Sequence, residues 1–124
     1  MIVFLSGELG AGKTTLVRGI LRALGYRGRV KSPTFSLVEL YTVSSLYFYH
    51  FDFYRFKDPQ EIEEAGLREH FGGNGVCLVE WPERAQGWLP APDLGIHMSE
   101  YGGGRLARLE AHTERGSECL SGLA

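Results

Sequence analysis

The feature that most constrains this chain is a glycine-rich loop that follows its first apolar run. Residues 1–6 (MIVFLS) lead directly into GELGAGKTT at 7–15, which contains the pattern Gly-x4-Gly-Lys-Thr. An apolar strand, a loop with glycines at these two places and a Lys-Thr pair that opens a helix match the phosphate-binding P-loop. Glycines adopt backbone conformations closed to other residues, so several N–H groups can turn inward around a polyphosphate. The sequence therefore predicts a nucleotide-binding site at its start.

The polar residues of this loop have separate chemical roles. Lys13 supplies a positive charge that reaches the β- and γ-phosphates, and Thr14 supplies a hydroxyl for Mg²⁺. The positive end of the following helix favours the bound anion. The residues expected to contact the nucleotide are Glu8, Leu9, Gly10, Ala11, Gly12, Lys13, Thr14 and Thr15.

The segment after the loop predicts a helix. Its apolar residues recur at helical spacing and form one stripe, made of Leu16, Val17, Ile20, Leu21 and Leu24. Arg18 and Arg22 lie off this stripe, which places them on a solvated face, and Gly25 is placed to end the helix.

Composition limits the remaining classes of protein. With 124 residues, 44% of them hydrophobic and 23% charged, the chain suits one globular domain over residues 1–124. The net charge of −2 gives no basic footprint for autonomous binding to nucleic acid. The chain has no signal segment and no apolar run of membrane-spanning length, so we expect a cytoplasmic protein without membrane contact. Cys77 and Cys119 make neither a metal pair nor a disulfide framework, and Cys77 is expected in the core.

Two β-rich runs, at 35–41 and 46–54, are joined by polar residues and predict an antiparallel hairpin. In the second run the side chains alternate, so His50 and Asp52 share a face at the end of the strand. A carboxylate there can bind a metal-held water or a substrate hydroxyl; the alternative is a polar pair on an edge strand. Arg55 follows immediately, and such a charged cluster is costly unless it is paired, which favours a functional role.

A second helix is predicted after this hairpin. Asp58 reads as its N-cap, Pro59 as its first helical residue and Glu61 as the partner in a capping box. The pattern is interrupted by Gly66 and resumes at 67–71.

The C-terminal part predicts a second hairpin. Residues 94–100 and 105–112 flank a glycine-rich turn at 101–104. Residues 113–124 are small and polar and are expected to fray.

The second strong signal is the apolar run Gly75-Val76-Cys77-Leu78-Val79-Glu80. It predicts a buried parallel strand that ends in a carboxylate. In P-loop proteins the neighbouring strand typically carries such an acid to hold Mg²⁺, directly or through water, so Glu80 is the candidate metal ligand; the alternative is that Glu80 merely starts a loop. Trp81 follows, and we expect it either near the nucleotide or at the edge of the core.

The loop at 30–36 supplies one more candidate. Pro33 disfavours helix for the residue before it, and a polar loop after the phosphate helix lies where nucleotide-dependent switch segments are found. Thr34 can reach the γ-phosphate or its Mg²⁺ from such a loop, or it can be an ordinary turn threonine.

Four motifs in this order carry a family resemblance. GELGAGKTT at 7–15, SPTF at 32–35, HFDFYR at 50–55 and EWPE at 80–83 together resemble the bacterial TsaE (formerly YjeE) family, and the likeness covers nearly the whole chain. The resemblance implies an α/β fold of the P-loop NTPase type, in three layers, with a mixed sheet that carries antiparallel hairpin additions.

The resemblance also implies an activity. It indicates a small ATPase, with ATP and Mg²⁺ as its ligands, that is weak alone and works with the TsaB and TsaD proteins. Together they form N6-threonylcarbamoyladenosine in tRNAs that read codons beginning with A, so contact with tRNA is indirect. By this resemblance Lys13 and Thr14 bind phosphate and Mg²⁺, Thr34 is a switch residue, Asp52 is catalytically important and Glu80 is a metal ligand.

One departure and two alternatives remain. Members of this family usually carry some tens of residues before the P-loop strand, whereas this sequence begins with that strand at Met1, so a trimmed or atypical start is expected. A small P-loop kinase is the alternative function, but it requires an acceptor-binding insert and an arginine-rich lid. A GTPase requires an Asn-Lys-x-Asp motif, which the chain lacks.

Overall fold

The computed structural model describes residues 1–8, 12–31, 33, 37–43, 45–58, 60, 66 and 68–122. Its elements in chain order are β1 (Ile2–Ser6), α1 (Lys13–Ala23), β2 (Val38–Val43), β3 (Leu46–Asp52), α3 (Arg68–Phe71), β4 (Val76–Glu80), the 3₁₀ helix η1 (Pro82–Ala85), β5 (Leu94–Tyr101), β6 (Gly104–Ala111) and α4 (Glu114–Ser121). None of the helices so described is long and apolar enough to cross a membrane.

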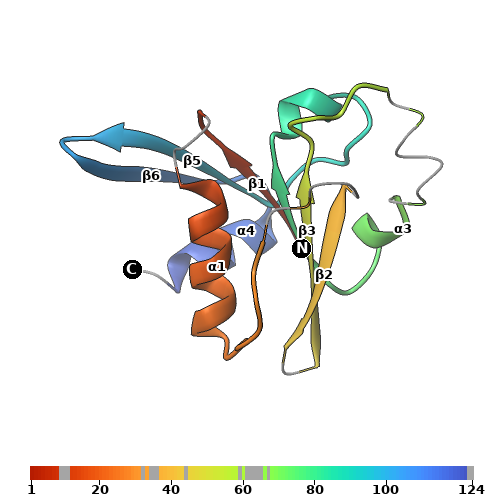
Figure 1. Ribbon diagram of the computed structural model, residues 1–124, viewed down its shortest axis with the longest axis horizontal. Helices are drawn as coiled ribbons and strands as arrows, with labels where there is room; N and C mark the ends of the chain where they lie inside the picture. The colour runs from red at the N-terminus through yellow and green to blue at the C-terminus, as the bar shows by residue number, and fades with distance from the viewer. Residues whose placement is uncertain are drawn as a thin grey trace.

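The six strands form one mixed sheet in the order β2-β3-β4-β1-β5-β6 (Figure 1). The four inner strands pair in parallel, with β1 between β4 and β5 and with β3 beyond β4. The outer strands β2 and β6 pair antiparallel with β3 and β5. The mixed sheet and both hairpins that the sequence predicts are therefore confirmed, and the C-terminal ends of β1, β3 and β4 meet at one edge.

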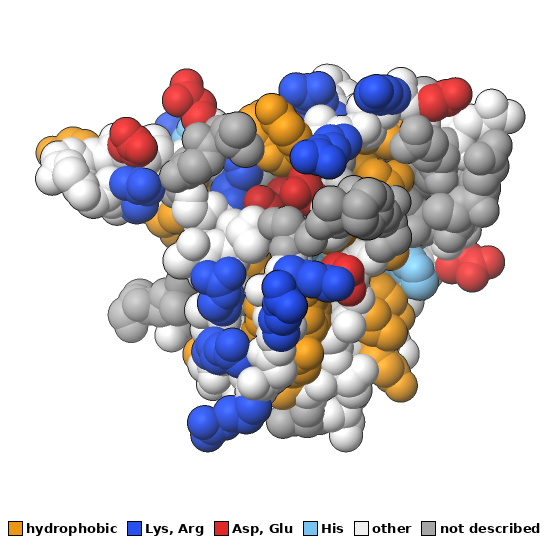
Figure 2. Space-filling model, viewed as in Figure 1, with side chains coloured by type: hydrophobic (Ala, Val, Ile, Leu, Met, Phe, Trp, Pro, Cys, Tyr) orange, Lys and Arg blue, Asp and Glu red, His pale blue; other side chains and the backbone are white. Residues whose placement is uncertain are grey.

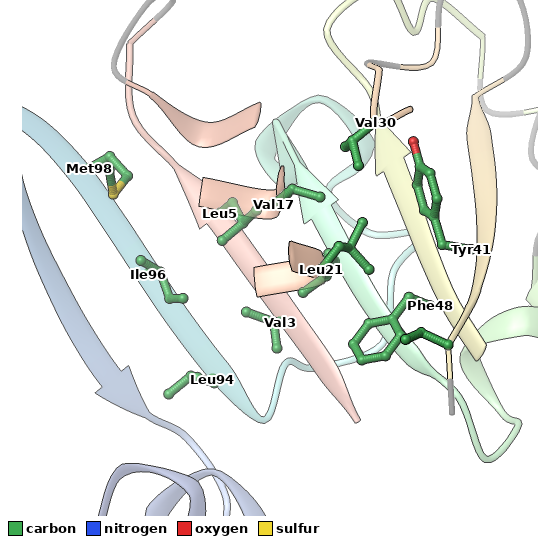
Figure 3. Close-up of a cluster of buried hydrophobic side chains, with 12 residues drawn as sticks. Val3, Leu5, Val17, Leu21, Val30, Tyr41, Phe48, Leu94, Ile96 and Met98 are labelled. Carbon is green, nitrogen blue, oxygen red and sulfur yellow. The ribbon is translucent and has the colours of Figure 1, made fainter. Parts of the chain in front are cut away.

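The face of the sheet that carries α1 holds the larger of two apolar clusters. Leu120 of α4 packs against this cluster. The members of the cluster come from the sheet, from α1 and, in the case of Val30, from the segment after α1 (Figure 3): Val3, Leu5, Val17, Leu21, Val30, Tyr41, Val43, Phe48, Leu78, Leu94, Ile96 and Met98. Alternation along β1 and β4 sends every second side chain to this face and the others to the opposite face. Cys77 belongs to the second set and is buried, as predicted.

The opposite face is covered by α3, η1 and the segments around them. The second cluster consists of Ile2, Phe51, Phe53, Phe56, Cys77, Val79 and Ala85, with Phe71 and Trp88 among the residues packed against it. The three predicted layers are therefore helices on one side, the sheet in the middle, and short helices with loops on the other side.

Helix α1 ends as its sequence predicts, with one exception. Gly25 has a φ of 101° and its N–H donates to Arg22 O at 3.1 Å, while Tyr26 N–H donates to Leu21 O at 2.9 Å. These two bonds are a Schellman motif, which requires the left-handed conformation that glycine adopts readily. The expectation that Leu24 is buried with the rest of the stripe is wrong: Leu24 is the C-cap and 43% exposed, because it lies at the very end of the helix, where the chain turns away at Gly25.

The end of β3 also differs from the prediction. The strand stops at Asp52 instead of residue 54, because the Asp52 side chain accepts a hydrogen bond from Tyr54 N–H at 3.0 Å and turns the chain there. Its partner β2 begins at Val38, while residues 35 and 36 lie outside the described part.

The predicted second helix is described only in part. Asp58 Oδ1 accepts from Gln60 N–H at 3.0 Å, which agrees with a cap at Asp58. Pro59 and Glu61 lie outside the described residues, and α3 covers the resumed pattern.

The expectation that residues 113–124 fray is wrong for most of that segment. Glu114–Ser121 form α4, with Thr113 as N-cap accepting from Gly116 N–H at 3.2 Å. Thr113 also donates to Asp93 Oδ1 at 2.7 Å, and a Cβ at Gly116 would lie 1.9 Å from Asp93 O. Tertiary contacts with the segment before β5 therefore hold this weakly apolar helix in place.

Lys and Arg side chains gather over α1 and the segment after it (Figure 2). Residues 9–38 contain no Asp or Glu, and both Arg18 and Arg22 are exposed. Arg22 donates to the carbonyls of Tyr26 and Gly28 at 3.2 and 2.7 Å. The solvated face predicted for these two arginines is confirmed.

We expect Leu21→Ala to lower the free energy of unfolding by about 2–5 kcal/mol, because Leu21 is fully buried between α1 and the sheet. Leu24→Ala, three residues later on the same helix, is the matched control and should change it by less than about 0.5 kcal/mol. Urea denaturation followed by circular dichroism measures both. Equal losses would contradict the position of the stripe described above.

Candidate functional site

The P-loop places Lys13 and Thr14 at the start of α1. β1 ends at Ser6, Gly7 has a φ of 143°, and Gly12 caps the helix with a φ of 100°. A Cβ at Gly12 would make only ordinary contacts, so the positive φ is what requires glycine there. Leu9, Gly10 and Ala11, which the sequence predicts to contact the nucleotide, lie outside the described residues.

Lys13 is turned inward and is only 4% exposed. Its ammonium donates to the carbonyl of Gly7 and, at 3.2 Å, to that of Glu8. It also lies 4.0 Å from the centroid of the Trp81 ring. Burial lowers the pKa of Lys13, and the nearby charges of Glu80, Glu83 and Asp52 oppose that shift. The Lys13 side chain is therefore held at the mouth of the loop by contacts that a phosphate can replace.

Glu80 lies at the C-terminal end of β4, directly beside the end of β1. The parallel register pairs Leu5 with Glu80. Thr14 Oγ1 donates to the Glu80 carboxylate, 3.0 Å from Oε2 and 3.2 Å from Oε1. The carboxylate is nearly fully buried, with 3% of the residue exposed. The hydroxyl and the acid that the sequence assigns to one metal ion are thus in contact.

His50 completes a buried group around that carboxylate. It comes from β3, is fully buried, and its Nε2 lies 2.5 Å from Glu80 Oε2. Because a carboxylate only accepts hydrogen bonds, the Nε2 atom carries the proton that joins them. Nδ1 has no hydrogen-bond partner among the described residues.

Asp52 lies at the same edge, one strand further out. The register pairs it with Glu80, and its side chain is half-buried. Burial raises the pKa of Asp52, and the Glu80 charge raises it further, while the hydrogen bond from Tyr54 N–H and the charges of His50 and Lys13 lower it. Asp52 therefore lies close enough to Glu80, His50 and Lys13 for their charges to affect its pKa.

Trp81 joins this site to the core. Its φ of 57° and ψ of 49° place a bulky residue in the left-handed region, at a cost of about 1–2 kcal/mol. The ring packs at the edge of the second cluster, where one of the two interpretations placed it, and it also faces Lys13. A position of Trp81 next to the nucleotide stays a prediction. The Arg84 guanidinium lies over the rings of Tyr54 and Trp81, at 5.4 and 5.8 Å from their centroids.

A cavity of about 590 Å³ opens beside the loop. It lies between the end of β1, the start of η1 and the β5 strand, and is lined by Ser6, Gly7, Glu8, Trp81, Glu83, His97, Met98, Ser99 and Glu100. A volume of this size suits a small organic ligand. Three carboxylates line it, so it suits the uncharged part of a nucleotide better than the phosphates.

The donor set at Thr14 and Glu80 fits Mg²⁺. Both supply oxygen atoms, the ligand type that this hard cation prefers. Within the described ranges no group of three or more His, Cys, Asp or Glu residues could hold a metal. Mg²⁺ is usually held by one or two protein oxygens together with phosphates and waters.

The comparisons with known proteins decide the family. Residues 1–107 match the family described as threonylcarbamoyl adenosine biosynthesis protein TsaE. The chain belongs to the TsaE family. The P-loop ATPase class inferred from the sequence is consistent with this family.

Two curated relatives and one solved structure illustrate the likeness. The tRNA threonylcarbamoyladenosine biosynthesis protein TsaE of Haemophilus influenzae is 44% identical over the whole chain, which spans 78% of that relative. TsaE of Bacillus subtilis is 44% identical over 101 residues, 82% of this chain and 63% of the relative. The crystal structure of Bacillus subtilis YdiB has a TM-score of 0.81 at 34% identity, and the match covers 98% of this chain and 75% of that one.

The site of this TsaE-family chain combines residues that the sequence predicts with others that it missed. Lys13, Thr14 and Glu80 meet as expected, with Asp52 and Trp81 around them. Thr34 lies outside the described residues, so its switch role stays a prediction. The sequence also placed His50 on the same face as Asp52, but its bond to Glu80 depends on the order of β3 and β4 in the sheet. The β5 residues that line the cavity carry no local motif.

We expect Asp52→Asn to stabilise the ligand-free protein at neutral pH. The folded-state pKa of Asp52 is raised, so stability is lost as the pH rises above the unfolded-state pKa, and the loss is complete above the folded-state pKa. Asparagine removes the charge and keeps the oxygen that accepts from Tyr54 N–H. The gain should shrink as the pH falls, because the native carboxyl takes up its proton at a higher pH than the carboxyl of the unfolded chain does.

Asp93→Asn is the matched control, and we expect this substitution to destabilise the protein at neutral pH. Burial alone would raise the pKa of Asp93, but hydrogen bonds from Ile2 N–H at 2.8 Å and Thr113 at 2.7 Å help to lower it. Its stabilising effect is therefore present above the unfolded pKa and lost as the pH falls. Thermal unfolding between pH 4 and about 7.5 compares the variants. A destabilised Asp52→Asn at neutral pH would contradict the strain assigned to this carboxylate.

Proposed function

We propose that this protein binds ATP with Mg²⁺ and hydrolyses it during formation of N6-threonylcarbamoyladenosine in tRNA. The observation that carries the proposal is the contact of Thr14 with Glu80, 3.0 Å apart, beside the inward-turned Lys13. A nucleoside triphosphate with Mg²⁺ requires a cationic side chain, a hydroxyl and a carboxylate where a parallel strand meets the N-terminus of a helix. The family membership supports the pathway, and within it we place the protein in the cytoplasm, acting on tRNAs that read codons beginning with A.

The residues divide the work by position. Lys13 exchanges its contacts with the loop carbonyls for the β- and γ-phosphates, and the N–H groups at the start of α1 bind phosphate oxygens. Thr14 and Glu80 would hold Mg²⁺, which neutralises charge that develops on the phosphates. Asp52, half-buried at the same edge, orients the attacking water or a substrate group. The cavity beside Trp81 takes the nucleoside part.

The proposed turnover is slow without partners. Rapid phosphoryl transfer usually needs an arginine that stabilises the transition state. Arg84 is engaged with the rings of Tyr54 and Trp81, and Arg55 is exposed. We therefore assign the missing stimulation to TsaB and TsaD, with tRNA contacted through the assembly.

Replacement of the P-loop lysine tests nucleotide binding. Lys13→Met keeps the aliphatic stem in its buried position and removes the charge, so the fold should persist. Loss of one charge-assisted contact costs about 1.5–3 kcal/mol, which weakens binding of ATP with Mg²⁺ roughly ten- to a hundredfold. Lys31→Met is the matched control. The Lys31 side chain is 60% exposed, and its ion pair with Glu39, at 3.7 Å, lies at the surface. Calorimetry measures both, and unchanged affinity in Lys13→Met would refute the site.

A second experiment distinguishes the roles of Glu80 and Asp52. Glu80→Gln should raise the Mg²⁺ requirement and weaken ATP binding about tenfold or more, because it removes the charged ligand beside Thr14. Asp52→Asn should keep most of the binding and lose turnover and modification of tRNA in the system reconstituted with TsaB and TsaD. Titrations of Mg²⁺ and ATP followed by turnover assays compare the variants. If Asp52→Asn loses the Mg²⁺ dependence and Glu80→Gln keeps it, the metal ligand comes from β3 instead of β4.

A further inference from the structure

His50 is the most deeply buried polar side chain of the site, and the roles assigned so far do not use it. It lies on β3 with 0% exposure, on the face that carries α1. A fully buried imidazole is costly unless its nitrogens are satisfied. One nitrogen, Nε2, bonds to Glu80 at 2.5 Å, and the other has no partner within the described part of the chain. All of the polar stabilisation described for His50 therefore comes from one carboxylate oxygen.

Glu80 is fixed from two sides by this arrangement. Thr14 on α1 donates to both carboxylate oxygens, at 3.0 and 3.2 Å, and His50 on β3 bonds to Oε2. If Thr14 turns its hydroxyl oxygen toward a metal ion, His50 remains as the donor that holds the carboxylate in place. Only 3% of Glu80 is exposed, so water is a poor substitute for that donor.

We propose that His50 is a positioning residue for Glu80. Its Nε2–H fixes the orientation of the carboxylate, so that the oxygen opposite the imidazole is directed to the Mg²⁺ of the bound nucleotide. This inference rests on the proposed function, since it assumes that Glu80 serves the metal ion. Partners of metal-binding carboxylates commonly act in this way, and their loss typically weakens metal affinity about 10–100-fold.

The alternative is that His50 only fills space beneath α1. Phe48, two residues earlier on the same face of β3, is large, apolar and only 4% exposed. A space-filling role depends on volume and shape. A positioning role depends on a donor at the place of Nε2, which separates the two readings experimentally.

Three substitutions of His50 test this difference. His50→Phe keeps an aromatic ring and removes the donor. His50→Gln can place its amide N–H near the position of Nε2, whereas the shorter amide of His50→Asn falls at the position of Nδ1 and cannot reach Glu80. Phe48→Leu is the matched control, because it perturbs the same core face without a contact to Glu80.

The measured quantity is the Mg²⁺ concentration that gives half-maximal binding of ATP, together with the affinity for ATP in EDTA and the melting temperature. We expect His50→Phe and His50→Asn to raise the Mg²⁺ requirement about tenfold or more, with little change in EDTA. His50→Gln should restore most of the wild-type requirement. Phe48→Leu should lower the melting temperature without a change in the Mg²⁺ requirement.

Two results would overturn the inference. One is a wild-type Mg²⁺ requirement in a folded His50→Phe; the other is equal behaviour of His50→Gln and His50→Asn, which holds even if His50→Phe fails to fold. Failure of the proposed function looks different, because wild-type protein would then bind no ATP with Mg²⁺ and Lys13→Met would match it. Binding by the wild type with an unmoved Mg²⁺ requirement in the His50 variants refutes the positioning role alone.

Discussion

The buried carboxylate of Glu80 is the interaction on which the site depends, because three separate elements meet at it. Thr14 brings the N-terminus of α1, His50 brings β3, and Glu80 itself ends β4. A buried, hydrogen-bonded carboxylate is expensive to disturb, since removal of one partner leaves polar groups unpaired in a low dielectric. The contacts of one side chain therefore fix the relative positions of the P-loop helix and two parallel strands at the edge where the phosphates are expected.

The alternation of the central strands explains how this polar group coexists with two apolar clusters. On β4, Cys77 and Val79 pack on one face, while Leu78 packs on the other face with Glu80 following it toward α1. On β3, Phe51 joins the second cluster, whereas His50 lies on the side of α1. Strands β3 and β4 thus supply apolar side chains for most of their length and polar side chains only near their C-terminal ends, beside the P-loop. The same alternation of side chains therefore builds the core along each strand and the site at its end.

Local sequence was sufficient for the elements whose signals are local. The P-loop, the apolar β4 run and the two hairpins carry their own spacing and turn chemistry, so their order and type are confirmed. Contacts between distant segments were less accessible. Helix α4 was missed because its position depends on Asp93 and on the close approach at Gly116, and the bond between His50 and Glu80 depends on the strand order. Leu24 was misplaced because helical spacing alone does not show where a helix turns away from the sheet.

Several groups of the site lie in unfavourable positions that a bound nucleotide would relieve. Lys13 donates to carbonyls of its own loop and lies over Trp81, which itself occupies the left-handed region. The half-buried Asp52 carries a raised pKa beside Glu80. Strain and uncompensated charge of this kind are typical of sites prepared for a charged ligand, whose binding free energy offsets their cost. A phosphate would take the Lys13 ammonium away from the loop carbonyls, and a cation between Thr14 and Glu80 would lessen the repulsion between the two acids. If the proposed Mg²⁺ binds between Thr14 and Glu80, the same arrangement would favour binding of nucleotide and metal together over binding of either alone.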